Sequence, residues 1–294
     1  MWHKVVFNGL PGTGKTTCAL SYPGVRQIVF GADEEVTALN FRDRTDIFPP
    51  LKLDWYETLK PEERAKFTDE KISELDIAKL TKIGRSRNVR RLRQYLYRTK
   101  DALLAGANVN LQTLVLDNLT PFSQEFEDYT ETIWEREFIT KEGGFDTAAY
   151  YKRFASELSD FLRLFMSLPC HTLVTCHIGM MMPEEVAAVT PFFQQAKSGG
   201  KREWLPLLTG KGARNAVASI PAYRFFLKTE ESAGQASTFI AKLEADEANV
   251  GMATARIQPF ENPRRICFPR NRFYETFQAA LEEYLKTGVP VKNP

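Results

Sequence analysis

The segment from Gly9 to Thr16 has the residue types of a phosphate-binding loop: spaced glycines, then a lysine and a hydroxyl residue. The glycines let successive backbone N–H groups turn inward and hold phosphate oxygens. Lys15 is expected to reach the β- and γ-phosphates, and the Thr16 hydroxyl to bind Mg²⁺. The pattern G-x-x-x-x-G-K-[ST] is complete and predicts a Mg-ATP site. The residues expected to contact the nucleotide are Gly9, Pro11, Gly12, Thr13, Gly14, Lys15, Thr16 and Thr17.

A carboxylate partner for the magnesium is expected at Asp117, which directly follows the apolar run 113–116. In such sites an acidic residue at the end of a strand holds Mg²⁺ directly or through water. Asp117 also fits the N-cap of a helix that begins at Leu119. The sequence favours the first interpretation, because a phosphate loop needs a metal partner. Thr16 and Asp117 are therefore the predicted metal ligands.

Hydrolysis needs a group that orients or deprotonates the attacking water. Glu34 is the first candidate and Glu35 the second, since both follow the apolar run 27–30. A solvated acidic turn is the alternative. His177 follows the run 172–176 and is predicted to sense the γ-phosphate. The alternative is a structural role, because a lone histidine more often serves as a hydrogen-bonding residue within the fold. Lys15, Glu34, Glu35 and His177 form the predicted catalytic set.

These residues are positioned by short, continuously apolar and β-branched runs, which are typical of strands covered by helices on both faces. Because ligands bind at the carboxyl ends of strands in open α/β sheets, the polar residues that follow the runs are expected to converge. The fold class is therefore α/β, with a mostly parallel sheet flanked by helices. The expected strands are 4–8, 27–30, 113–116, 172–176 and 222–227, and a helix is expected to begin at Thr16 after the loop.

The rest of the chain is expected to form a single domain over 1–294 with two interruptions. One is a helical insertion at about 43–106, with helical patterns over 62–78 and 88–104. The other is a poorly patterned, mobile loop at about 178–212, and loops of that length are usually functional. Strand-like pieces near 237–243 and 253–257 and an amphipathic helix over 274–286 complete the chain.

Composition leaves the function class open but favours a cytoplasmic protein. The chain has 294 residues, ordinary apolar and charged fractions, and a net charge of +2, so bulk charge does not indicate nucleic acid. Four cysteines without a metal-ligand spacing predict reduced thiols. No apolar run approaches the ~20 residues of a membrane span. We therefore expect neither a signal peptide nor contact with a membrane.

In order along the chain, the phosphate loop, the acidic residues after the next strand, Asp117-Asn118 and Cys176-His177 resemble the RecA-like ATPase core. The pattern is most similar to compact phage-encoded members, the phage nucleotide-binding proteins, some of which act as single-strand annealing proteins. The resemblance covers about 1–42 and 110–230. It implies ATP at a subunit interface, so that the protein self-associates. It also implies that basic residues of a neighbouring subunit, Lys211 or Arg214, reach the nucleotide.

Two segments are candidates for nucleic acid. The run 79–100 contains nine Lys or Arg, two tyrosines and no acidic residue, which fits phosphate neutralisation with base stacking. It equally fits pairing with the acidic segment 125–142. The resemblance implies that the loop 178–212 contacts single-stranded DNA. The named candidates are Arg87, Arg90, Arg91 and Tyr95 in the first segment, and Phe192, Phe193, Lys197, Lys201 and Arg202 in the second.

The leading hypothesis is a RecA-like ATPase that binds single-stranded DNA in phage recombination, annealing or replication. A phage or host replication or recombination protein is a possible partner, and the compartment would be the bacterial cytoplasm. Two alternatives share the same loop. A small-molecule kinase would use the 43–106 insertion as a substrate cap, and a nucleotide-gated loader or accessory protein would bind ATP without appreciable turnover.

Overall fold

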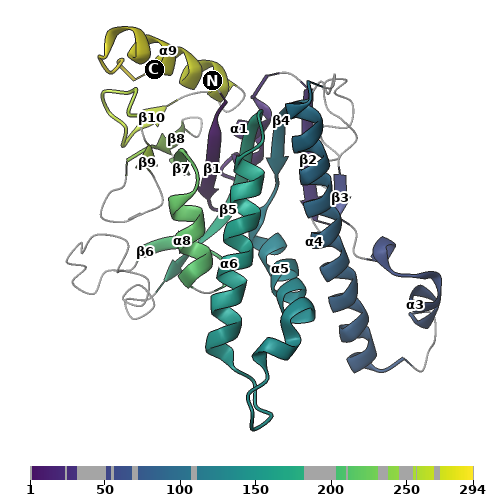
Figure 1. Cartoon of the computed structure of the whole chain (residues 1–294). Coiled ribbons are helices and arrows are strands. Elements are labelled where there is room, and N and C mark those ends of the chain that lie inside the picture. The colour runs from purple at the N-terminus through teal and green to yellow at the C-terminus, as the bar shows by residue number, and fades with distance from the viewer. Residues whose placement is uncertain are drawn as a thin grey trace.

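A central sheet with helices on both faces forms the body of the molecule (Figure 1). The predicted α/β class with a mostly parallel sheet is confirmed. The computed structural model describes residues 2–23, 25–31, 51–53, 56–67, 72–106, 111–181, 203–209, 211–230, 238–244, 254–255, 257–267 and 272–293.

Within those ranges, six strands run parallel, and the first strand of the chain lies between two of them. β1 has β5 on one side and β7 on the other, so its carboxyl end is flanked by the ends of two strands from distant parts of the chain. Such a change in strand order creates the crevice in which open α/β sheets bind ligands. Across the sheet the strands are β3 (Leu51–Leu53), β2 (Val25–Gly31), β4 (Leu111–Leu116), β5 (His171–Met181), β1 (Lys4–Gly9) and β7 (Tyr223–Glu230).

Helices cover both faces because successive side chains of each strand point to opposite sides. Val5 and Phe7 of β1 pack into a buried cluster with α1 (Lys15–Leu20) and α9 (Phe273–Thr287). Val6 lies in the cluster on the other face. There the covering helices are α4 (Glu74–Leu104), α5 (Leu119–Trp134), α6 (Thr147–Met166) and α8 (Lys211–Ser219) (Figure 1). The predicted buried strands are thus confirmed, with ends shifted by a few residues.

The segment 43–106 differs from the expected helical insertion. β3 adds a parallel strand to the edge of the main sheet beside β2. It is followed by the short helices η2 (Tyr56–Thr58) and α3 (Pro61–Lys66). In place of two helices over 62–78 and 88–104, α3 is followed by α4, a single helix of 31 residues. Since Val89, Leu92 and Leu96 of α4 are buried in the core, α4 is part of the helix layer that covers one face of the sheet.

Tertiary contacts explain why α4 is continuous where the sequence suggested a break. Gly84, Ser86 and Asn88 are weak helix formers, yet all three are buried against neighbouring elements. The Gly84 carbonyl accepts a hydrogen bond from the Thr58 hydroxyl (3.0 Å), and the Asn88 amide donates to the Glu125 carboxylate of α5 (3.3 Å). Packing of this kind outweighs propensities that differ by less than ~1 kcal/mol per residue.

The irregular stretch expected over 178–212 is narrower in the structure. β5 continues to Met181 and pairs antiparallel with β6 (Glu203–Pro206), and α8 begins at Lys211. Residues 182–202 and 210 lie outside the described ranges. The expected C-terminal strands and helix are confirmed. The remaining elements are η3 (Glu135–Phe138), β8 (Thr238–Lys242), β9 (Thr254–Ala255) and β10 (Ile266–Cys267). None of the described helices is long and apolar enough to cross a membrane.

A cluster of aromatic and histidine rings closes the amino edge of the sheet, opposite the phosphate loop. His3 lies edge-on to the rings of Tyr22, His171 and Phe277, which belong to separate parts of the chain. The His3 backbone N–H donates to Nδ1 of His171 (3.0 Å), and Nδ1 of His3 lies 3.2 Å from the Tyr22 hydroxyl. Burial lowers the pKa of His3 to about 4 and that of His171 to about 3, so both rings are neutral at pH 7.

These two histidines predict that the protein loses stability in mild acid. Above pH 6.5 they are neutral whether the chain is folded or unfolded, so they contribute no pH dependence. Below pH 6.5 the unfolded chain binds protons that the folded chain excludes down to about pH 4. Each histidine therefore lowers the free energy of unfolding by up to about 1.4 kcal/mol per pH unit.

The measurement is urea denaturation of the wild type and of His171→Asn at pH 7.5, 6 and 5. The asparagine oxygen can still accept from the His3 backbone, but the side chain does not titrate. We expect the variant to lose less stability than the wild type between pH 7.5 and 5. Parallel losses in the two proteins would contradict the assignment.

Candidate nucleotide-binding site

The loop between β1 and α1 has the backbone geometry that phosphate binding requires. Gly12 and Gly14 have φ values of 78° and 84°, in the left-handed region that favours glycine. A Cβ atom on Gly9 would lie 2.5 Å from the Thr13 hydroxyl oxygen and 2.9 Å from the Leu227 carbonyl oxygen. These three glycines therefore shape the loop for separate reasons, two through backbone conformation and one through close packing against β7.

Lys15 is the first residue of α1, and its side chain is buried beneath the loop. Its ammonium group donates to the carbonyl oxygens of Gly9 (3.0 Å) and Leu10 (2.8 Å). The positive charge of Lys15 is therefore held inside the curve of the loop. Carbonyl oxygens are weaker partners for an ammonium group than phosphate oxygens are. This arrangement fits a triphosphate, because the anion would draw the ammonium group away from these carbonyls.

The two predicted metal ligands lie side by side. The Thr16 hydroxyl donates to Oδ2 of Asp117 over 2.7 Å, across the gap between α1 and the end of β4. The Thr175 hydroxyl of β5 donates to Oδ1 of the same carboxylate over 2.5 Å. Asp117 is only 5% exposed, so these bonds fix both of its oxygens within the protein.

This pair fits Mg²⁺ better than a metal bound by protein ligands alone. No group of three or more His, Cys, Asp or Glu suited to a metal occurs within the described residues. Mg²⁺ keeps several waters and is usually bound by one or two carboxylates together with substrate phosphates. Thr16 and Asp117 would hold such an ion, which would supply charge neutralisation to a bound triphosphate.

His177 reaches the same edge from β5. It lies in register with Gly9, the last residue of β1, so the ring is beside the start of the loop. Nε2 of His177 is 2.9 Å from the side-chain nitrogen of Asn118. Burial lowers the pKa of His177, and the nearby Lys15 ammonium lowers it further. The ring is therefore neutral at pH 7 and close to the position expected for the γ-phosphate.

Sequence reasoning misses three residues of this site: Asn118, Thr120 and Thr175. Asn118 caps α5, since its side-chain oxygen accepts from the Thr120 backbone N–H (2.8 Å). The Thr120 hydroxyl accepts from the His177 backbone N–H (3.0 Å). Thr175 carries the one available signal, because it is a hydroxyl residue within an apolar strand. The sequence offers Asp117 as a possible cap, but the adjacent Asn118 is the residue that caps the helix.

Several predicted site residues are not placed beside the loop. Glu34 and Glu35 lie outside the described residues, as do the five candidates of the 178–212 segment: Phe192, Phe193, Lys197, Lys201 and Arg202. Only the backbone of Lys211 is described, at the start of α8. Nε of Arg214 donates to the Leu208 carbonyl oxygen over 3.1 Å within the same chain. The roles predicted for these residues stay predictions.

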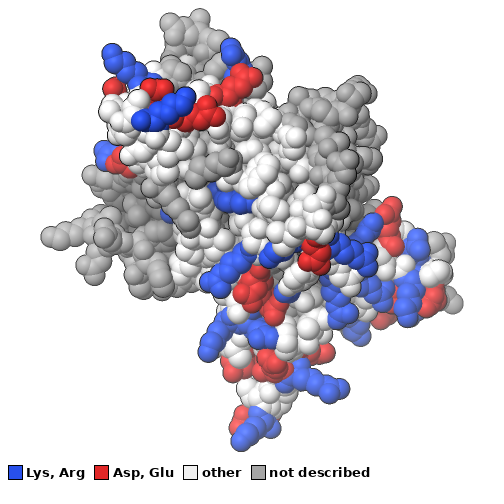
Figure 2. Space-filling model, turned by 45° about the horizontal axis from the view of Figure 1, so that its top comes forward, with Lys and Arg blue, Asp and Glu red and all other residues white. Residues whose placement is uncertain are grey.

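Much of the basic run on α4 pairs with carboxylates of the same chain, as one of the two sequence interpretations anticipated. Arg85 contacts Asp128 of α5 (3.3 Å), and Lys82 contacts Glu131. Arg93 contacts Glu157 of α6 (2.6 Å). Figure 2 shows Lys and Arg intermingled with Asp and Glu over the lower part of the molecule. Carboxylates from neighbouring helices therefore neutralise much of the positive charge that the sequence shows in this run.

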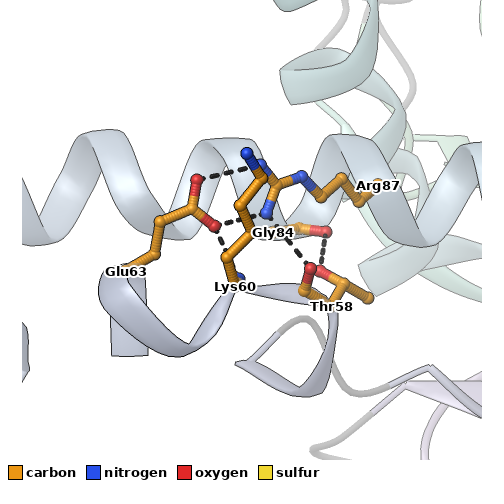
Figure 3. Close-up of polar contacts among 5 residues, drawn as sticks. All are labelled: Thr58, Lys60, Glu63, Gly84 and Arg87. Carbon is orange, nitrogen blue, oxygen red and sulfur yellow. Dashed lines mark hydrogen bonds and ion pairs between the residues drawn. The ribbon is translucent and has the colours of Figure 1, made fainter. Parts of the chain in front are cut away.

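Two of the four nucleic-acid candidates on α4 are occupied by internal contacts. The guanidinium of Arg87 binds both oxygens of Glu63 in α3 (2.5 and 2.9 Å) and also donates to the Thr58 carbonyl (3.1 Å) (Figure 3). This contact holds the pKa of Glu63 at about 2. Tyr95 packs against the buried core. Arg90 and Arg91 remain exposed, with no ion pair to any residue in the described ranges.

Comparison with known families agrees with this geometry. A family model described as an AAA domain matches residues 2–198. The matched span contains the loop, Asp117 and His177, and it ends before Lys211 and Arg214. No curated protein matches the chain.

Replacing Lys15 with alanine is expected to weaken nucleotide binding strongly. A hydrogen bond to a charged group is worth about 1.5–3 kcal/mol, which corresponds to a roughly 10- to 150-fold rise in Kd. The measurement is calorimetric titration of a non-hydrolysable ATP analogue with Mg²⁺. Lys286→Ala removes an equal charge from the last turn of α9 and should leave Kd unchanged. Equal affinities in wild type and Lys15→Ala would refute the site.

Proposed function

The chain belongs to the AAA domain family of P-loop NTPases, and from that premise we propose that it is a Mg²⁺-dependent ATPase that acts on single-stranded DNA. The observation that carries the nucleotide part of the proposal is the hydrogen bond between Thr16 and Asp117, which lies beside the Lys15 ammonium. A hydroxyl, a carboxylate and an ammonium at one helix start suit a metal-bound triphosphate.

Each residue has a definite role under this proposal. Lys15 neutralises the β- and γ-phosphates, and Thr16 and Asp117 hold the magnesium ion. His177 contacts the γ-phosphate end of the site as a neutral ring. Glu34, or failing that Glu35, orients or deprotonates the attacking water. The bound Mg²⁺ supplies charge neutralisation on the phosphate oxygens.

The DNA part of the proposal draws on the exposed face of α4. Arg90 and Arg91 are followed about two turns later by Tyr97 and Arg98, so these side chains share one side of the helix. All four are exposed, with 52% of Tyr97 accessible to solvent. Arginines that neutralise phosphates beside an aromatic ring that stacks on a base are typical of single-strand binding. Arg87 and Tyr95 are left out of this surface because internal contacts occupy them.

We further propose that the protein self-associates, with ATP at the interface between subunits. Lys211 or Arg214 of a neighbouring subunit would then stabilise the charge that develops on the γ-phosphate. Nε of Arg214 donates to the Leu208 carbonyl oxygen, and a phosphate oxygen is a stronger partner for a guanidinium than a carbonyl is. The loop that contains Phe192, Phe193, Lys197, Lys201 and Arg202 is a second DNA contact. Phage recombination, annealing or replication is the process that we propose this activity serves.

ATPase assays with and without single-stranded DNA test the proposal directly. We expect Mg²⁺-dependent turnover that rises when a single-stranded oligonucleotide is added, and retention of the oligonucleotide in the presence of an ATP analogue. Light scattering under the same conditions should show a complex larger than one chain. Turnover that ignores DNA, together with phosphoryl transfer to an added acceptor, would identify a kinase. Binding of ATP without turnover would identify a loader.

The double variant Arg90→Ala/Arg91→Ala tests the exposed face of α4. Loss of two phosphate contacts should weaken single-strand binding and reduce the slope of log K against log salt by about 1.4. Lys152→Ala/Arg163→Ala is the matched control, since it removes the same charge from exposed positions on α6. If both double variants bind the oligonucleotide with the same salt slope, α4 is not the DNA surface.

A further inference from the structure

The orientation of the Asn118 side-chain amide is fixed by its bond to α5. Its oxygen accepts a hydrogen bond from the Thr120 backbone N–H (2.8 Å), and a backbone N–H can only donate. The amide nitrogen therefore has to be the atom that faces His177, 2.9 Å from Nε2. The two ends of one amide thus contact a helix start and a histidine ring.

This orientation determines which nitrogen of His177 carries the proton. An amide NH₂ group has no acceptor, so it must donate to Nε2. A neutral imidazole with an accepting Nε2 carries its hydrogen on Nδ1. The buried ring therefore has one tautomer as long as Asn118 keeps its cap on α5.

The protonated nitrogen lies beside the phosphate loop. Nδ1 is buried, and no acceptor among the described residues meets full hydrogen-bond geometry with it. Gly9 is the neighbour of His177 across the β1–β5 pairing. Its carbonyl oxygen accepts from the Lys15 ammonium at 3.0 Å. The Gly9 carbonyl also interacts with the His177 side chain, so the histidine shares this neighbour with the lysine that is expected to bind phosphate.

We propose that Asn118 is a positioning residue that locks His177 in the Nδ1–H tautomer, so that the contact of the ring with the Gly9 carbonyl, which Lys15 shares, strengthens when Lys15 moves away. This inference rests on the proposed function, because Lys15 leaves that carbonyl only when it moves to a phosphate. A buried donor that lacks full hydrogen-bond geometry is unfavourable, and departure of Lys15 would leave the carbonyl free to bond the ring more fully. His177 then detects nucleotide through the loop backbone, and Asn118 connects the ring to the start of α5.

The tautomer is measurable without any activity assay, by ¹⁵N NMR of histidine side chains. The chain contains only three histidines, and a His177→Gln spectrum assigns the signals of that ring. His171 is an internal reference of the opposite kind, since its Nδ1 accepts from the His3 backbone and its proton is therefore on Nε2. In the wild type we expect Nδ1 of His177 to be protonated and Nε2 to be unprotonated.

Asn118→Asp is the decisive variant, because it retains an oxygen that caps α5 and replaces the donor that faces His177 with an acceptor. We expect His177 to carry a proton on Nε2 in this variant. Asn118→Ala removes both contacts and should give a mixture of tautomers. Unchanged His171 signals and an unchanged melting temperature show that Asn118→Asp is folded. A wild-type ring protonated on Nε2, or the same Nδ1–H ring in all three proteins, would overturn the proposal.

A second arm separates this inference from the proposed function. Addition of a Mg²⁺–ATP analogue to the wild type should shift the Nδ1 signal of His177, and the Asn118→Ala protein should show less than half that shift. If the wild type binds no nucleotide, the proposed function fails and the tautomer result still stands. If it binds nucleotide but the His177 signal stays constant, the link between Lys15 and His177 fails alone.

Discussion

Two threonine hydroxyls hold the Asp117 carboxylate at the carboxyl edge of the sheet, and much of the structure follows from this contact. A carboxylate that is 5% exposed needs a partner for each oxygen. Thr16 brings one partner from the start of α1, and Thr175 brings the other from β5. β5 lies between β4 and β1, which places Thr175 beside the end of β4 and brings the helix that follows β1 close to the same carboxylate. The order of the strands therefore determines which side chains meet at the site.

The carboxyl and amino edges of the sheet differ in the kind of side chains that they bring together. At the carboxyl edge, polar groups are held close together around Lys15, and their bonds are of a kind that a charged ligand replaces. At the amino edge, the rings of His3, Tyr22 and His171 close the sheet with buried, neutral groups. β1 passes through both, so the amino-edge cluster fixes the strand whose other end becomes the loop.

The sequence predicts those parts of the site that depend on local chemistry. The loop needs glycines at particular φ values, and the metal pair needs a hydroxyl after Lys15 and a carboxylate after an apolar run. Asn118 escapes prediction because its importance comes from His177, which lies 59 positions away in the chain. The basic run on α4 is open to two interpretations in sequence for a similar reason. Arg87 looks available in sequence, but its partner Glu63 is brought to it by the fold alone.

The helix layer links the nucleotide site to the exposed face of α4, and its strength comes mainly from apolar packing. Partly exposed ion pairs such as Arg85–Asp128 contribute about 0–1 kcal/mol each, so they set register more than stability. In contrast, Phe126 of α5 and Leu92 of α4 are fully buried in one cluster, and each contributes about 1.5–3 kcal/mol. The start of α5, where Asn118 lies, and the helix that carries Arg90 and Arg91 are therefore held in one layer by apolar contacts more than by the ion pairs between them.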